Sequence, residues 1–305
     1  MFKVEFSDCG QAAERFQQVG LDVQAVQLVG GELRGTLEAA SLGTVLFLRS
    51  NMSHRTLFAG EKMYGYRPFC WMSGGGSSYY QAGTSEGGEL CGFMDGRTEA
   101  HCHWDGTLNF VYLSEKYFKG YFLASRAYKA LDRIEHCDKL PLSPHGLQSL
   151  KRLHRHGLEG RLQDEDQVYS LVTSLLEEPD EVITGLSECK NQSLLKRLVE
   201  LAHETAEGEP LKLPDICKML YASRSTLSAA CLESYGVSVG SLMRLARLEQ
   251  CRIALGQGMS VGQVMKKYRF TNRARFAAYY KAAFGVLPSG QIELFGPDCP
   301  NVVVG

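Results

Sequence analysis

The chain has 305 residues, of which 44% are hydrophobic and 22% charged, and its formal net charge is −1. This length predicts two domains, and the composition is ordinary for a soluble protein. No run approaches the roughly 20 apolar residues of a membrane span, and the N-terminus lacks the apolar core of a secretion signal. We therefore expect a cytoplasmic protein with no membrane partner.

The first 113 or so residues predict strands, because short β-branched or aromatic runs alternate with Gly-rich turns. Many short strands of this kind favour a sandwich or a small barrel. The predicted strands are Val4–Phe6, Val23–Val26, Val45–Leu48, Met63–Tyr66 and Leu108–Leu113.

Rings and polar side chains are mixed in this strand-rich part, which is the composition of a pocket that holds a polar ligand. The alternative is an ordinary strand-domain core with some exposed rings. The candidate ligand-binding residues are Arg49, His54, Tyr64, Tyr66 and Trp71.

Helical periodicity begins after Ser114, a candidate N-cap, and again after Ser143-Pro144. A clean apolar stripe then follows the helical spacing and ends before Pro179. This stripe, or the helix Leu147–Leu153 before it, predicts either a homodimer surface or packing against the strands. The stripe consists of Val168, Leu171, Val172, Leu175 and Leu176.

The last hundred or so residues contain two copies of one pattern, about 50 positions apart. The first copy runs from Leu213 to Val237 and the second from Ser260 to Val286. Each copy predicts a short apolar helix, a tight turn and a second helix opened by Ser, Thr or Asn as N-cap. This order is typical of a helix-turn-helix motif, whose second helix enters the major groove of DNA.

Charge supports the same interpretation. Between Leu211 and Gly290 there are 12 Lys and Arg against 3 Asp and Glu, a net charge of +9, so the rest of the chain carries −10. A basic module of this size suits a phosphate backbone, since neutralising phosphates releases condensed counterions.

Within each copy, the apolar positions define a core and the others a DNA-facing surface. Arg pairs best with guanine, Asn with adenine, and small side chains suit a thymine methyl. A connecting helix would leave Arg244, Arg247 and Arg252 free to contact phosphates and would set the two reading helices in adjacent major grooves, about 34 Å apart. The predicted DNA-facing residues are Arg224, Ser225, Ser228, Ala229, Asn272, Arg273, Arg275, Ala277, Ala278 and Lys281.

This arrangement resembles the AraC family of bacterial transcription regulators from about Leu194 to Pro288. The resemblance is carried by Ser223–Leu227, Gly236–Ser238, Leu245–Leu248 and Phe270–Ser289. It implies a regulator of promoter DNA that has an N-terminal sensing or dimerising domain and activates transcription by contact with RNA polymerase. A weaker similarity, in the rhythm of the N-terminal half from Gly31 to Trp71, is to the regulator of ethanolamine utilisation.

The chain departs from the family in its turns. Tyr221 and Arg269 stand where the family usually has Gly, and Met265 where it usually has Ala. A non-Gly residue in a left-handed turn costs about 1–2 kcal/mol. Either these turns differ from those of the family, or the strain is absorbed.

The predicted fold class is therefore α+β, with a strand-rich N-terminal domain followed by helices and an all-α C-terminal domain. We expect a sensing or dimerisation domain at residues 1–185, a double helix-turn-helix domain at 191–290 and a tail at 291–305. The boundary is predicted in the polar stretch Thr184–Glu188, and Asn191 is the expected N-cap of the first helix beyond it.

An enzymatic alternative is a bifunctional DNA-repair methyltransferase, one class of which joins a related DNA-binding module to reactive cysteines. It needs a cysteine cluster that binds zinc, and Cys9, Cys70, Cys91 and Cys102 are scattered in sequence. His101 and His103 have a spacing used in cupin metal sites, but the further Glu and His of such a site do not follow. We therefore expect no enzyme, no metal and no cofactor.

Overall fold

A computed structural model of the chain describes residues 2–61, 63–73, 78–80, 84–85, 88–93, 99–137, 139–178 and 191–290. The predicted boundary at Thr184–Glu188 and the predicted tail, residues 291–305, lie outside these ranges. Contacts divide the chain into two units. The first unit holds Met1–Ser7, Gln11–Gln24 and Arg34–Lys190, and the second holds Asp8–Gly10, Ala25–Leu33 and Asn191–Gly305.

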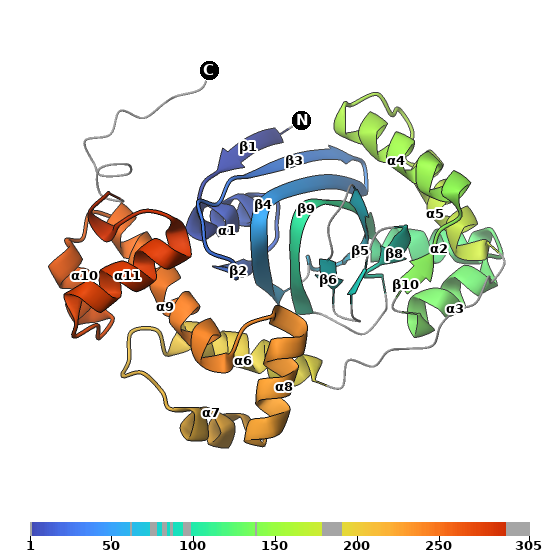
Figure 1. The fold of residues 1–305 in the computed structure, drawn as a ribbon. Helices are drawn as coiled ribbons and strands as arrows, with labels where there is room; N and C mark the ends of the chain where they lie inside the picture. Colours follow the sequence, from blue (N-terminus) through green and yellow to red (C-terminus); the bar gives the residue numbers. More distant parts are fainter. Residues whose placement is uncertain are drawn as a thin grey trace. The chain divides into compact units, whose positions relative to one another are not determined.

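The first unit is built on one ten-stranded antiparallel sheet, whose long strands bend (Figure 1). The longest strands, β4 and β9, pair from Val45↔Leu113 to Glu61↔Glu99, with a register shift between Met52 and Thr56. Three short strands lie off the main path, where β2 (Val23–Gln27) pairs with β4, β6 (Ser78–Tyr80) with β9, and β7 (Thr84–Ser85) with β6. Along the main path the order is β1 (Phe2–Phe6), β3 (Gly35–Leu42), β4 (Val45–Glu61), β9 (Glu99–Ser114), β5 (Tyr66–Ser73), β8 (Glu89–Cys91) and β10 (Lys139–Pro141).

The helices α2 to α5 bury one face of this sheet. Side chains of alternate strand residues, including Phe47, Trp71 and Val111, form one core with helix residues such as Phe118 and Val172. Alternation along the strands places these residues on the same face of the sheet. The helices of this unit are α1 (Cys9–Gln18), whose first two residues belong to the second unit, α2 (Glu115–Ala124), α3 (Tyr128–His136), α4 (Pro144–Leu158) and α5 (Asp166–Glu177).

The apolar stripe of α5 belongs to this core. Val168, Val172, Leu175 and Leu176 are buried, and the half-buried Leu171 packs against them. Leu150 of α4 is buried in the same cluster. These residues pack within the domain, which is the alternative that the sequence left open, and the buried part of the stripe is not available to a second protomer.

The second unit contains the predicted helices of the C-terminal part, and the α+β class is confirmed. Helix α6 contacts α7, α8 and α9, and α9 contacts α10 and α11. No helix of the described part of the chain is long and apolar enough to cross a membrane. The helices are α6 (Gln192–Glu204), α7 (Leu213–Leu220), α8 (Arg224–Tyr235), α9 (Val239–Gly256), α10 (Val261–Lys267) and α11 (Arg273–Phe284).

Two short segments from the start of the chain complete this second unit. The backbone N–H of Gln27 donates to Glu249 Oε1 of α9 at 3.2 Å, and the N–H of Gly31 donates to the carbonyl of Ala283 at 3.1 Å. Glu249 is 1% exposed, and burial raises the pKa of its carboxyl to about 7. The sequence pattern does not predict this grouping, because the partners are more than 200 residues apart.

Candidate DNA interface

The first helix-turn-helix unit is defined by three local signals. Helix α7 ends at Tyr221, which adopts the left-handed conformation with φ 52°. Ser223 then caps α8, because its Oγ accepts from the N–H of Thr226 at 3.1 Å. Helix α8 ends at Gly236, where φ is 70° and a side chain would be strained.

The second helix-turn-helix unit repeats this construction. Ser260 and Gln263 form a reciprocal capping box at the start of α10. Arg269 makes the left-handed turn with φ 58°, and Asn272 Oδ1 caps α11 by accepting from the N–H of Arg275 at 2.8 Å. Gly285 ends the helix with φ 79°. The doubled pattern of the sequence is thus a doubled structure.

Helix α8 presents one polar face beside its buried one. Leu227 and Cys231 are buried. Of the four residues predicted to face DNA, Arg224, Ser225 and Ala229 are exposed and Ser228 is half-buried.

Helix α11 carries the more basic surface. Phe276, Tyr280 and Phe284 lie in one core cluster with Leu248 and Val264. Its opposite side displays most of the predicted DNA-facing residues to solvent. Asn272, Arg273, Arg275, Ala278 and Lys281 are exposed, and Ala277 is half-buried.

Arg247 is not free at the surface, contrary to the prediction. It is 7% exposed, and its guanidinium donates to two backbone carbonyls, that of Thr205 at 3.2 Å and that of Tyr268 at 3.4 Å. Burial also lowers the pKa of this guanidinium. Arg252 is likewise buried, with its Cζ 4.7 Å from the centre of the Phe284 ring. Both arginines therefore stabilise the interior of the domain. Arg247 binds backbone carbonyls and Arg252 contacts the Phe284 ring, where the prediction had placed contacts with phosphates.

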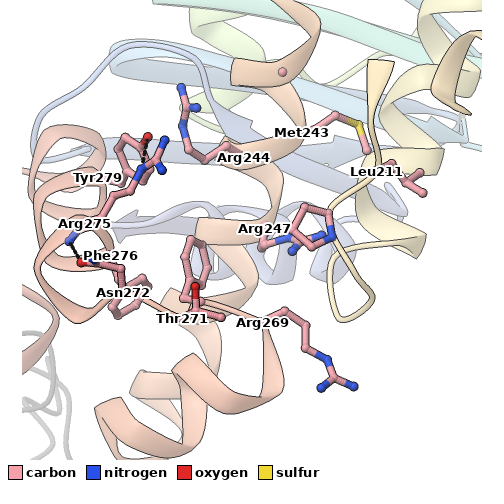
Figure 2. A pocket seen from close by; sticks show the side chains of 13 residues that line it. Leu211, Met243, Arg244, Arg247, Arg269, Thr271, Asn272, Arg275, Phe276 and Tyr279 are labelled. Atoms are coloured by element: carbon pink, nitrogen blue, oxygen red, sulfur yellow. Dashed lines mark hydrogen bonds between the residues drawn. The ribbon is translucent and has the colours of Figure 1, made fainter. Parts of the chain in front are cut away.

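Arg244 and Arg275 meet at a residue that sequence reasoning missed, Tyr279. Their Cζ atoms lie 4.6 and 5.3 Å from the centre of the Tyr279 ring, and Arg275 Nε donates to its hydroxyl at 2.8 Å (Figure 2). The spacing of four residues between Arg275 and Tyr279 is a detectable helical signal. Arg244 comes from a different helix, so no local pattern could have placed it there.

The candidate ligand-binding residues, which belong to the strand-rich first unit of the chain, do not form one cluster. Arg49 and Trp71 both pair with Asn109 in the sheet, and Arg49 Nε donates to Asn109 Oδ1 at 3.4 Å. Tyr66 pairs with Ser114, which lies five residues beyond Asn109 on β9. Tyr66 is therefore about 17 Å along the strand from Arg49 and Trp71.

The other two candidates are also apart from Trp71. Tyr64 is fully exposed in a turn, and His54 Nδ1 lies 2.8 Å from the hydroxyl of its neighbour Ser53. Trp71 itself is buried, 5.0 Å from the ring of His154, whose pKa burial lowers to about 4. The strand-domain core thus accounts for Trp71.

The cysteines and histidines weighed for metal binding are placed only in part. Cys70 and Cys91 are directly paired on β5 and β8, with their Sγ atoms 3.4 Å apart, whereas Cys9 belongs to the second unit. Within the described ranges, no group of three or more His, Cys, Asp or Glu is arranged to hold a metal ion. The side chains of His101, Cys102 and His103 are outside the described part, although their backbone belongs to β9.

Comparison with known proteins bears on this interface. Residues 216–291 match a family model described as a helix-turn-helix domain. The C-terminal part of the chain is a helix-turn-helix domain. That match begins in α7 and continues just past α11, so it includes both reading helices. No curated protein matches the chain.

Several solved structures are similar to the chain. The AraC-like transcriptional activator CuxR is 17% identical, with a TM-score of 0.40 over 87% of this chain and 100% of that one. The C-terminal domain of AraT, a response regulator from Geobacillus stearothermophilus, is 19% identical, with a TM-score of 0.31 over 33% and 84%. ToxT from Vibrio cholerae O395 is 13% identical, with a TM-score of 0.32 over 90% and 98%.

CuxR, among these structures, is described as AraC-like, and the AraC family is the one that the sequence resembles. The helix-turn-helix domain that the sequence predicts in this part of the chain is confirmed.

Proposed function

We propose that this regulator reads a specific, nonpalindromic DNA site with α8 and α11. The observation that carries the proposal is the pair of side-chain-capped helices, each of which keeps its apolar residues inside and its Arg and small residues outside. Because α9 joins the two helix-turn-helix units, one protomer offers both α8 and α11 to adjacent major grooves. The centres of these grooves are about 34 Å apart on one face of DNA.

Arg273 and Arg275 supply base contacts in this proposal, since an exposed guanidinium in the first turn of a recognition helix can bond to guanine. Arg224 takes the equivalent place on α8. Lys281 and Lys266 of α10, which are both exposed, neutralise phosphates. Arg247 supports the site by holding α6, α9 and the end of α10 together.

Three partners extend this proposal. A small-molecule effector of the first unit would act by binding the two functional states with different affinity. RNA polymerase contact would make the protein an activator in the cytoplasm. A homodimer would bring two copies to repeated sites, although the α5 stripe no longer provides its surface.

Capture of fragments from the host genome by the purified full chain tests the proposal. The expected result is one enriched motif with two parts separated by about one helical turn, concentrated upstream of genes. Enrichment of DNA without any motif would contradict sequence-specific reading. A palindromic motif would contradict reading by a single protomer.

A further inference from the structure

A cavity of about 370 Å³ opens beside the second reading helix, between α9, α11 and the segment at Leu211 (Figure 2). All its lining residues lie between Pro210 and Tyr279. The volume falls in the lower part of the roughly 300–1,000 Å³ range of small-ligand pockets. The cavity is therefore large enough for a compact organic molecule.

Its polar side is cationic. Arg244 and Arg275 both lie against the ring of Tyr279, which holds two positive charges at one place (Figure 2). Arg244 Nη2 donates to Ser241 Oγ at 3.2 Å, and Arg275 Nε donates to the Tyr279 hydroxyl. Neither arginine forms an ion pair with a carboxylate of the described residues, and the lining contains no Asp or Glu.

The other two arginines at the cavity are already engaged. Arg247 donates to the two carbonyls described above, and Arg269 Nε lies 3.7 Å from Glu209 Oε1. Arg247 is therefore not available to a ligand, and the exposed Arg269 faces a carboxylate, which leaves Arg244 and Arg275 as the two arginines of the lining that neither a backbone carbonyl nor a carboxylate of the described residues binds. Guanidinium groups bind carboxylates through parallel hydrogen bonds, which makes a carboxylate a fitting partner.

The remaining wall is apolar. Phe270, Phe276, Met243 and Leu211 line it, and Phe276 is fully buried. A DNA phosphate could meet the arginines at the rim, but it has no apolar part to cover these rings and the Met243 thioether. An anion that carries a ring or a short hydrocarbon body matches both walls.

We propose that this cavity binds a small carboxylate with an aromatic or short apolar body, held by Arg244 and Arg275 and by the ring wall of Phe270. Such a ligand competes with DNA, because Arg275 and Asn272 lie at the start of the α11 recognition helix. The competition rests on the proposed function, whereas ligand binding itself does not.

The test uses full-length protein with ¹³C-methyl-labelled methionine and the probe 4-phenylbutyrate. The Met243 methyl signal is assigned by its loss in Met243→Leu. We expect the probe to shift this signal progressively through the ring current of its phenyl group. 4-Phenylbutanol, which lacks the charge, and acetate, which lacks the body, should shift it at least about tenfold less at equal concentration.

Matched variants locate the site. Gly240 and Gly262 each occupy the second position of a helix after a Ser cap, and an added Cβ meets no atom within 4 Å at either. Only Gly240 lines the cavity. Gly240→Phe should abolish the Met243 shift, and Gly262→Phe should retain it. Arg244→Met should weaken probe binding about tenfold, whereas Arg224→Met should leave it unchanged.

The results separate the two claims. Absence of a Met243 shift, an equal shift with 4-phenylbutanol, or an unaltered shift in Gly240→Phe would overturn the carboxylate site. If the probe shifted the Met243 signal but did not displace DNA from the protein, the carboxylate site in the cavity would be retained and the competition with DNA would be contradicted. If the protein bound no specific DNA at all, the methyl signals would still decide whether the cavity binds the probe.

Discussion

Tyr221 and Arg269 occupy the same position in the two helix-turn-helix units, and both adopt the left-handed conformation, with φ 52° and 58°. These are the two positions at which the resembled family usually has Gly. The sequence departs from the family, but the turns keep the geometry that Gly would allow. Each turn therefore carries backbone strain of about 1–2 kcal/mol.

We predict that Tyr221→Gly stabilises the chain by up to about 1 kcal/mol, because it relieves this strain and offsets the greater flexibility of Gly when unfolded. Tyr221 is 91% exposed, so little packing is lost. Denaturant unfolding measures the change. Gly236→Ala, which introduces a side chain at φ 70°, is the opposite control and should destabilise.

Arg247→Ala should destabilise the second unit by about 1–3 kcal/mol, because it removes the side-chain donor to the buried carbonyl of Tyr268 and one of the two donors to the carbonyl of Thr205, which also accepts from the N–H of Gly208. Thermal unfolding of the variant measures this loss. DNA binding well below the unfolding temperature should keep its sequence preference. A fully stable variant with weakened affinity for all DNA would instead support the original expectation of a phosphate contact.

Glu249 predicts a pH dependence of stability. Burial is the largest cause of its raised pKa, which lies at about 7 against an ordinary value of 4.5, and the groups facing it include Arg252, Cys9 and Asp8. Because the folded state favours the protonated acid, this contribution to stability is present at low pH and is lost as pH rises through 7.

The matched variant for this effect is Glu249→Gln. The stability of the wild-type chain relative to this variant should fall by up to about 3 kcal/mol between about pH 5 and pH 8. Denaturant titrations of both proteins across that range measure it. A constant difference between the two proteins would show that the carboxyl does not titrate there.

Local signals explain how much of the interface was predictable. Ser223, Asn272 and Gly285 act through bonds and dihedral angles within a few residues, so their roles follow from sequence order. The exposed faces of α8 and α11 follow from helical periodicity around Leu227 and Phe276.

The remainder depends on contacts distant in sequence. Arg247 lies on a helix that the apolar periodicity of the sequence predicts. Its hydrogen-bond partners are carbonyls of other elements, so its burial was not predictable. Helix α1 and strand β3 were also missed, although both carry a local signal: Cys9, Ala12 and Phe16 are buried at helical spacing, and buried residues alternate along most of β3. Gln27 and Glu249 meet only through the tertiary fold.

Arg273→Ala should cost about 1–3 kcal/mol in binding the captured site and relax the preference at one or two base pairs. The reason is that its exposed guanidinium contacts a base edge in the proposed complex. Lys266 is exposed on α10, outside the recognition helices. Lys266→Ala should therefore weaken binding to all DNA sequences alike. Equal, sequence-independent losses from both variants would mean that α11 does not read bases.

The most direct test of the central claim is titration of the full chain against the captured motif and a shuffled duplex of equal length, at several salt concentrations. We predict that the motif binds at least about 10³-fold more tightly and that log affinity falls linearly with log salt for both duplexes. Equal affinity for the two duplexes, or affinity that does not change with salt, would contradict a regulator that reads DNA with α8 and α11.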